Sequence, residues 1–182
     1  MTAGRTNVTN VVDWNTPPVY VDAVLRVLGQ VDLDPCSNGH SLVPATHTYQ
    51  LPVDGLEETW DYPRIFVNPP YGRDSVRKTS MMSWVSKAAD AHERFGSEIL
   101  MLIPVATNTR HFKDIIFTKF TAICFLADTR LKFYVDGEEH TKGAPMACCM
   151  VYVGDALDKF TEVFSEFGTV FPIASSISSE IQ

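Results

Sequence analysis

The chain has 182 residues, of which 45% are hydrophobic and 20% charged, and its formal net charge is −7. These values fit an ordinary globular protein with enough apolar residues for a full core, arranged as one domain or one domain with extensions. They argue against a protein that binds nucleic acid through its overall charge, and no apolar run reaches the ~18 residues of a membrane span.

The ends of the chain and its cysteines complete this outline. We expect residues 1–12 to form a flexible arm, residues 13–173 a single domain, and residues 174–182 a disordered tail. The polar first residues lack the apolar stretch of a secretory signal, so we expect a cytoplasmic protein. The four cysteines, which form no CxxC pair and therefore predict reduced thiols and no metal site, are Cys36, Cys124, Cys148 and Cys149.

The charged residues are unevenly spread along the chain. Residues 64–142 hold 12 Lys and Arg against 9 Asp and Glu, whereas the rest of the chain holds 3 against 13. Cations therefore gather in the middle of the chain, a distribution that is typical of a nucleic-acid-binding surface. An acidic protein must also place its few cations somewhere, and that simpler explanation stays open.

Helical and strand patterns alternate along the chain. Thr16 as N-cap and Pro17 at the first helical position predict the start of a helix that Gly29 ends. Residues 37–53 are rich in loop signals, and residues 57–61 predict a short helical turn. Further helices are predicted at residues 82–95, after residues 107–109, and at residues 155–167 with Gly168 as the stop. Strands are predicted at residues 31–34, 65–67, 98–103, 121–126, 130–134, 148–153 and 170–171.

This alternation predicts an α/β fold with a parallel sheet. Ligands of such sheets bind beyond the carboxyl ends of the strands, and Asp34, Asn68 and Pro104 all fall at such ends. The sequence contains neither GxGxxG nor GxxxxGK[ST], which disfavours dinucleotides and nucleoside triphosphates. A cofactor without phosphates would need no such loop.

The most informative stretch follows the strand at residues 65–67 and reads Asn68-Pro69-Pro70-Tyr71. The two prolines end the strand in a rigid turn. The side-chain oxygen of Asn68 and the carbonyl of Pro69 can each accept one hydrogen of an exocyclic amino group, while Tyr71 can stack on the ring that carries it. Holding both hydrogens frees the nitrogen lone pair, so no general base is needed before attack. The alternative is a prolyl turn that only closes a core strand.

Three other features each allow a structural and a functional interpretation. Trp14 is either a hydrophobic staple ahead of the first helix or an aromatic wall over a ligand. Asp34 is well placed to bind a ribose or an ammonium group, although an Asp-Pro pair is more often only a turn. The basic loop at residues 73–79 can lie on phosphates or simply be solvated.

An ordered set of segments resembles the phage-type DNA N6-adenine methyltransferases, a group related to the Dam-like enzymes. The match runs from Trp14 to about Val153. The Asn-Pro-Pro-Tyr segment also occurs in methyltransferases that act on protein glutamine and on RNA guanine, so the whole set is the more specific signal. The segments are Trp14-x-Thr16-Pro17, Leu33-Asp34-Pro35-Cys36, Leu51-Pro52-x-Asp54-Gly55-Leu56, Asn68-Pro69-Pro70-Tyr71-Gly72-Arg73, Trp84-Val85-x-Lys87-Ala88, Pro104-x-x-Thr107-x-Thr109-Arg110-x-Phe112, Arg130-Leu131-Lys132-Phe133 and Ala144-Pro145.

The resemblance implies a Rossmann-like class I methyltransferase sheet, mostly parallel with an antiparallel C-terminal strand, and S-adenosylmethionine as the methyl donor. The glycine-rich first motif of most methyltransferases is absent, and the segment 34–38 stands in its place, as in the phage-type group. The catalytic positions implied are Asn68, Pro69, Pro70 and Tyr71. The donor-binding positions implied are Trp14, Thr16, Pro17, Asp34, Pro35, Cys36, Asp54 and Asn68.

The implied activity is methyl transfer to N6 of an adenine that has left the DNA stack. Little chain remains for a separate target-recognition domain, so we expect short or relaxed sequence specificity, or recognition completed by a second subunit. The open alternatives are methylation of cytosine N4, of an RNA base or of protein glutamine, and a non-catalytic module that binds nucleic acid or S-adenosylmethionine. A monomer or homodimer, and a role in restriction-modification or regulation, also stay open. The candidate DNA-phosphate contacts are Arg73, Arg77, Lys78, Arg130 and Lys132.

Overall fold

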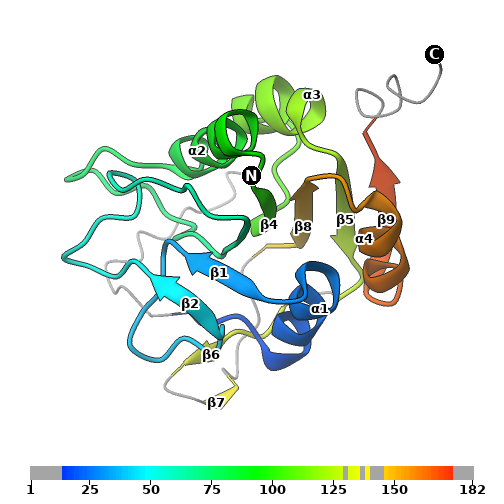
Figure 1. Cartoon of the computed structure of the whole chain (residues 1–182), viewed down its shortest axis with the longest axis horizontal. Coiled ribbons are helices and arrows are strands. Elements are labelled where there is room, and N and C mark those ends of the chain that lie inside the picture. Colours follow the sequence, from blue (N-terminus) through cyan, green and yellow to red (C-terminus); the bar gives the residue numbers. More distant parts are fainter. Residues whose placement is uncertain (1–13, 129–130, 136–137, 140–145, 174–182) are drawn as a thin grey trace, which may run out of the picture.

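The computed structural model of the chain describes residues 14–128, 131–135, 138–139 and 146–173 (Figure 1). The predicted arm at residues 1–12, the predicted tail at residues 174–182 and the candidate DNA contact Arg130 lie outside the described residues.

Short helices and strands alternate through most of the described chain. The helices are α1 (Pro18–Leu28), α2 (Met81–Phe95), the π-helical segment η1 (His111–Ile116), α3 (Phe117–Lys119) and α4 (Leu157–Phe164). The strands are β1 (Val31–Asp34), β2 (Ala45–Thr48), β3 (Arg64–Val67), β4 (Glu98–Pro104), β5 (Ala122–Leu126), β6 (Tyr134–Val135), β7 (Glu138–Glu139), β8 (Cys148–Val153) and β9 (Gly168–Pro172).

The main sheet has seven strands in the order β2-β1-β3-β4-β8-β5-β9, and β6 pairs with β7 in a separate two-stranded ribbon. Strands β2, β1, β3 and β4 pair in parallel. Strand β8 is antiparallel to both β4 and β5, so β5 runs in the same direction as β4. Strand β9 closes the sheet antiparallel to β5. The fold is therefore mixed α/β, and the prediction of a largely parallel sheet with a late antiparallel strand is confirmed.

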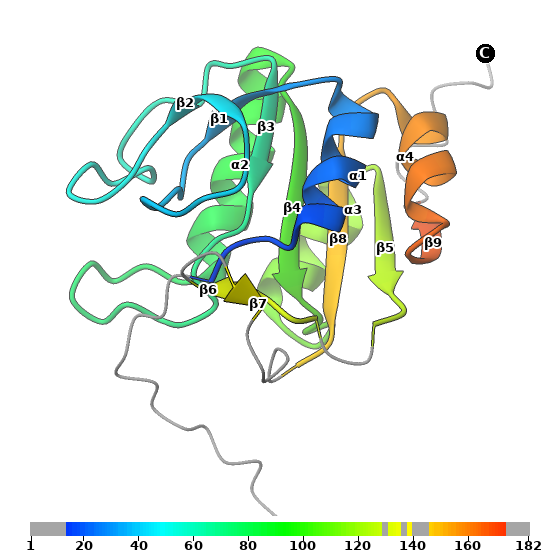
Figure 2. The same ribbon diagram turned by 90° about the horizontal axis from the view of Figure 1, so that it is seen from below.

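Helices cover both faces of the sheet. One buried cluster joins α1 and α4 to one face, and a second cluster joins α2 and η1 to the other. The residues of β4 alternate between them: Leu100 and Leu102 belong to the first cluster, whereas Ile99, Met101 and Ile103 belong to the second. Figure 2 shows α1 and α4 on the opposite side of the sheet from α2. A sheet that is covered on both faces explains why β3, β4 and β8 are continuous apolar runs.

The start of the first helix differs from the prediction. Helix α1 begins at Pro18 with Pro17 as its N-cap, so the assignment of Thr16 as the capping residue is wrong. The carbonyl of Pro17 accepts hydrogen bonds from the backbone nitrogens of Tyr20, at 3.0 Å, and Val21, at 3.2 Å. The Thr16 hydroxyl is engaged elsewhere, with the turn after β3. Gly29 ends the helix as predicted, with a φ of 79°.

Two segments before β3 also differ from the prediction. The segment predicted as loop contains β2, an edge strand whose residues Thr46, His47 and Thr48 are exposed. An exposed strand of this kind has no apolar alternation that a sequence could reveal. The segment 57–61 is not helical, and Trp60 within it is buried and donates from its indole nitrogen to the Gly55 carbonyl at 2.8 Å.

Three later boundaries are corrected as well. The helix expected after residues 107–109 begins beyond Arg110 as η1, and the Thr109 hydroxyl donates to the Ala106 carbonyl at 2.6 Å instead of capping it. Within the strand predicted at residues 130–134, only Tyr134 of the described residues belongs to a strand, because β6 begins there. Helix α4 ends at Phe164, and Gly168 starts β9 rather than stopping a helix.

The turn after β2 depends on the absence of a side chain at Gly55. A Cβ atom at this position would lie 1.8 Å from the backbone oxygen of Pro35. We therefore expect Gly55→Ala to lower the free energy of unfolding by about 3 kcal/mol, because backbone atoms must move apart. Urea denaturation monitored by tryptophan fluorescence would measure this. Gly39→Ala is the control, since a Cβ there meets no atom within 4 Å, and equal stability losses in both variants would contradict the expectation.

Candidate active site

The carboxamide of Asn68 is fixed by two hydrogen bonds. Strand β3 ends at Val67, and the half-buried Asn68 follows at its carboxyl end. Nδ2 of Asn68 donates to the Thr16 hydroxyl at 3.1 Å and to the Trp14 carbonyl at 3.3 Å. Both N–H groups of the carboxamide are thereby used. The oxygen Oδ1 is the group that remains to accept a hydrogen bond from a substrate.

The segment 14–16 is itself held from the other side. The backbones of Asn15 and Tyr134 exchange hydrogen bonds of 2.8 and 3.0 Å, so this segment lies between the turn at Asn68 and the ribbon that begins with β6. The Trp14 ring packs against Phe133 with centroids 5.0 Å apart. The first segment of the described chain is therefore a wall of the site.

Asp34, at the carboxyl end of β1, is a buried carboxylate with only 4% of its surface exposed. Oδ1 accepts a hydrogen bond from the backbone nitrogen of Cys36 at 3.2 Å, and Oδ2 accepts one from the Ser41 hydroxyl at 3.3 Å. Removal from water nevertheless outweighs these bonds and raises the pKa of Asp34 to about 6. The carboxylate is thus ionised at neutral pH at a cost in free energy, and a cationic ligand would relieve that cost.

A small polar pocket brings these groups together. Its volume is about 20 Å³. Five residues predicted to bind a ligand line it, namely Trp14, Thr16, Asp34, Cys36 and Asn68. The other lining residues, which sequence reasoning missed, are Asn15, Ser37, Asn38, Ser41 and Val43. The predicted positions that are not among the lining residues are Pro17, Pro35 and Asp54.

Asn15 carries an unsatisfied donor in this pocket. Its Oδ1 accepts a hydrogen bond from Nδ2 of Asn38 at 2.8 Å. Its own Nδ2 is buried and, among the residues that the structure describes, is the side-chain nitrogen without a partner. A buried N–H donor without a partner costs free energy. It marks a place where an oxygen of a ligand would accept a hydrogen bond. In the sequence Asn15 is the unspecified position of Trp14-x-Thr16, so no pattern distinguished it.

Tyr71 and Cys36 are neutral groups. The Tyr71 hydroxyl donates to the Leu102 carbonyl at 3.4 Å, and its ring meets Phe133 edge-on with centroids 5.6 Å apart. Burial raises the pKa of Tyr71 well above its usual value, and burial together with the Asp34 charge does the same for the Cys36 thiol. Neither residue can therefore act as an anionic base or nucleophile at neutral pH.

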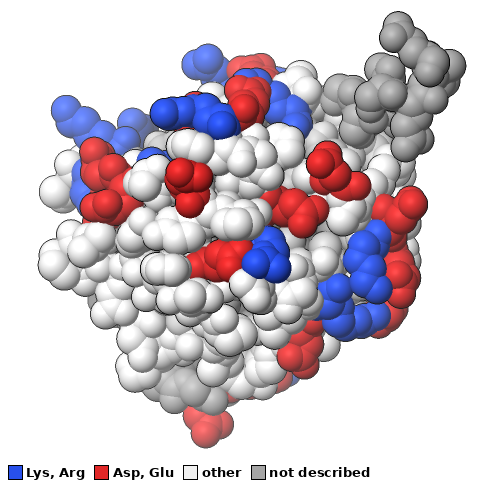
Figure 3. All heavy atoms as spheres, viewed as in Figure 1, with Lys and Arg blue, Asp and Glu red and all other residues white. Residues whose placement is uncertain are grey.

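The predicted Asp54 position and the basic loop after β3 are joined by an ion pair. Nη1 of Arg77 lies 3.0 Å from Oδ2 of Asp54, and its Nε lies 2.8 Å from Oδ2 of Asp74. Arg73 and Lys78 are exposed, and Lys132 pairs with Glu139 at 2.7 Å. On the face shown in Figure 3, acidic and basic side chains are intermingled rather than gathered into one basic surface.

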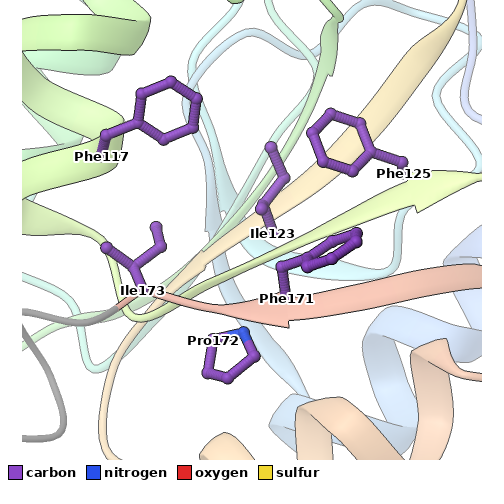
Figure 4. Close-up of a pocket in the computed structure, with 6 residues that line it drawn as sticks. All are labelled: Phe117, Ile123, Phe125, Phe171, Pro172 and Ile173. Carbon is purple, nitrogen blue, oxygen red and sulfur yellow. The ribbon is translucent and has the colours of Figure 1, made fainter.

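A larger hollow of about 340 Å³ lies at the far edge of the sheet, between β5, β9 and α3 (Figure 4). Figure 4 shows phenylalanine rings and aliphatic side chains around it. Its lining residues are Phe117, Ile123, Phe125, Phe171, Pro172 and Ile173. This lining has no ionisable or amide side chain, so the hollow offers no groups for group-transfer chemistry despite its size.

Fold and site together define an α/β protein with an Asn-Pro-Pro-Tyr turn and a small polar pocket at the carboxyl ends of parallel strands. The chain belongs to the DNA N-6-adenine-methyltransferase (Dam) family, whose family model matches residues 4–170. Membership of this family implies methylation of adenine N6 in DNA. A comparison with curated proteins finds no match.

Two features of the described residues add to this picture. None of the helices there is long and apolar enough to cross a membrane. No group of three His, Cys, Asp or Glu in the same part of the chain could hold a metal ion.

The raised pKa of Asp34 predicts a particular pH dependence of stability. Between pH 4 and 6 the folded state binds more protons at this carboxyl than the unfolded state, whose pKa is near 3.8. The free energy of unfolding should therefore fall by about 2 kcal/mol as pH rises through this range. We expect Asp34→Asn to abolish this part of the fall. The free energy of unfolding of the variant, measured relative to that of the parent, should therefore be higher at pH 7 than at pH 4.

Urea denaturation at both pH values would measure the difference. Asp22→Asn, on the exposed side of α1, is the matched control. Parallel pH profiles for Asp34→Asn and the parent would contradict the expectation.

Proposed function

We propose that the protein transfers a methyl group from S-adenosylmethionine to the exocyclic N6 of adenine in DNA, on a Rossmann-like class I methyltransferase sheet. The observation that carries this proposal is the fixed orientation of the Asn68 carboxamide, whose two N–H groups are bound by Trp14 and Thr16. An amide held in this way presents an acceptor to a substrate amine. Family membership supplies the nature of that amine.

The residues of the turn would act on the adenine amino group. Oδ1 of Asn68 and the carbonyl of Pro69 accept its two hydrogens, which draws the nitrogen toward tetrahedral geometry and frees its lone pair. Pro70 keeps the turn rigid, and the partly exposed ring of Tyr71 offers a surface for the base. Since the phenol and the nearby thiol are neutral, the proton leaves after methyl transfer rather than before it.

The side chains that line the polar pocket suit the amino-acid end of S-adenosylmethionine. The donor supplies an electrophilic sulfonium methyl group when it is bound. The buried Asp34 carboxylate suits its ammonium group, and the free donor Nδ2 of Asn15 suits its carboxylate. The pocket of about 20 Å³ is too small for the whole molecule, so its walls must open. The remaining residues proposed to line the opened site are Trp14, Thr16, Pro17, Pro35, Cys36 and Asp54.

The cations around the turn would contact DNA phosphates. Arg73 and Lys78 are exposed next to the site, and Lys132 is exposed beside the β6–β7 ribbon. Such contacts position the duplex without reading its sequence. Arg130 completes the proposed set, whereas the guanidinium of Arg77 is held by Asp54 and Asp74 and is assigned to the loop itself. Because these proposed contacts go to phosphates rather than to base edges, we propose short or relaxed sequence specificity.

Substitution of Asn68 tests the proposed chemistry. We expect Asn68→Ala to lower kcat for methyl transfer to adenine-containing DNA roughly 100- to 1000-fold, because one fixed acceptor for the amino group is lost. The melting temperature should stay close to that of the parent. Transfer from tritiated S-adenosylmethionine, followed by mass spectrometry of the digested nucleosides, would measure both the rate and the product.

Gln30→Ala removes a carboxamide that is exposed in the turn before β1 and serves as the control. An inactive parent enzyme, or a product other than N6-methyladenine, would contradict the proposed function. A loss of thermal stability that accounts for the lost activity of Asn68→Ala would favour a purely structural turn.

Substitution of Asn15 tests the donor pocket separately. Asn15→Asp keeps Oδ1 as the acceptor for Asn38 but replaces the unpartnered N–H donor with an oxygen. We expect the affinity for S-adenosylmethionine to fall about tenfold or more, since a hydrogen bond to a charged group contributes roughly 1.5–3 kcal/mol. Titration calorimetry would measure this. Unchanged affinity in a folded variant would contradict the proposed contact.

A further inference from the structure

We propose that Val76, at the tip of the loop between β3 and α2, is an apolar wedge that enters duplex DNA beside the target adenine. This inference rests on the proposed function and narrows its substrate to paired, double-stranded DNA. The loop at residues 73–79 is here called the tip loop.

The first observation is the exposure of Val76. Its side chain is 88% exposed, more than any other large hydrophobic residue in the described chain, where Leu51 follows at 59%. A branched aliphatic side chain that projects fully into water contributes nothing to the core. Among the roles open to such a side chain, insertion between stacked bases is one that proteins give to apolar residues.

The second observation is that the backbone of the tip loop is tied down, although the side chain is not. Oδ1 of Asp74 accepts hydrogen bonds from the backbone nitrogens of Val76, at 2.9 Å, and Arg77, at 3.0 Å. The backbones of Asp74 and Thr79 exchange two hydrogen bonds of 3.1 Å, which close the loop at its base. Val76 therefore lies on a turn whose backbone is fixed by hydrogen bonds. A side chain that pushes bases apart needs such a fixed support.

The third observation concerns the charges. The exposed cations Arg73 and Lys78 flank the tip on both sides of Val76 in the chain. Arg77 is different, because Asp54 and Asp74 hold its guanidinium. We assign Arg73 and Lys78 to the phosphates on either side of the wedge, and Arg77 to the positioning of the loop against residues 51–57. An apolar tip between two cations suits a groove bordered by phosphates.

The fourth observation is the place of the tip loop. Val76 follows Tyr71 by five residues, so the two Cα atoms lie no more than about 17 Å apart. Figure 2 shows the loop between β3 and α2 projecting at the same end of the sheet as β6 and β7. The tip can thus reach the duplex from which the adenine at Asn68 has been removed.

The physical role follows from the cost of extrusion. Taking a paired adenine out of the stack costs a few kcal/mol and leaves a gap in the helix. An apolar side chain that fills the gap recovers part of the lost stacking and delays the return of the base. This cost is smaller for an adenine that has no pairing partner.

The test compares the Val76→Thr variant with the parent enzyme on two DNA substrates. This substitution makes the side chain polar and leaves its shape nearly unchanged. One is a duplex with adenine paired to thymine, and the other is the same duplex with an abasic site opposite the adenine. We expect kcat/KM to fall about tenfold on the paired duplex and less than twofold on the abasic one. A second readout is the fluorescence of 2-aminopurine at the target position of the paired duplex, which should rise less with the variant than with the parent.

Val19→Thr, the same change at an exposed position of α1, is the matched control and should alter neither substrate. A parent enzyme that methylates adenine, with Val76→Thr unchanged on both duplexes or equally impaired on both, overturns the wedge and leaves the proposed function standing. A parent that methylates only single-stranded DNA also overturns the wedge. A parent that methylates no DNA at all refutes the proposed function and the wedge with it.

Discussion

The site depends on the pair of hydrogen bonds that Asn68 donates to Trp14 and Thr16. They join the carboxyl end of β3 to a segment 52 residues or more earlier in the chain. They also decide which end of the carboxamide is available to a ligand. Nδ2 already donates two hydrogen bonds, whereas Oδ1 remains available to accept one. The segment that receives them is also hydrogen-bonded to the backbone of Tyr134, so three parts of the chain that are distant in sequence come together beside Asn68.

This arrangement is supported by a sheet that is covered on both sides. The alternation of β4 residues between the two buried clusters fixes the strand in the centre of the molecule, beside β3. A short strand such as β3 could not hold an end in place by itself, but the parallel neighbours β1 and β4 pair with it on both edges. Rigid strands with polar ends are the usual basis of ligand sites in α/β proteins. The apolar hollow between β5, β9 and α3 has no such polar ends, which explains why the larger cavity is not the candidate site.

Much of this could be predicted from the sequence, and the exceptions share a physical cause. The buried strands β3, β4, β5 and β8 are apolar runs, and β1 alternates apolar and acidic residues, so their positions were evident. The exposed edge strand β2 has no such pattern and was missed. The capping prediction for Thr16 failed because its hydroxyl binds Asn68 instead of the helix, and a tertiary contact of this kind is invisible to local rules. Asn15 was missed for the same reason, since its importance lies in a bond that it lacks.

The guanidinium of Arg77 is shared between Asp54 and Asp74, and this sharing has a consequence for ligand binding. If the loop that carries Asp54 moves away from the tip loop, the Asp54 carboxylate loses its counter-ion. Moving either loop therefore costs the free energy of the same ion pair. Binding at one loop must then change the free energy of binding at the other loop, and the coupling has the same size in both directions. Donor and DNA, which we propose to meet these two loops, would bind with mutual dependence rather than independently, through a single cation that touches neither the methyl group nor the base.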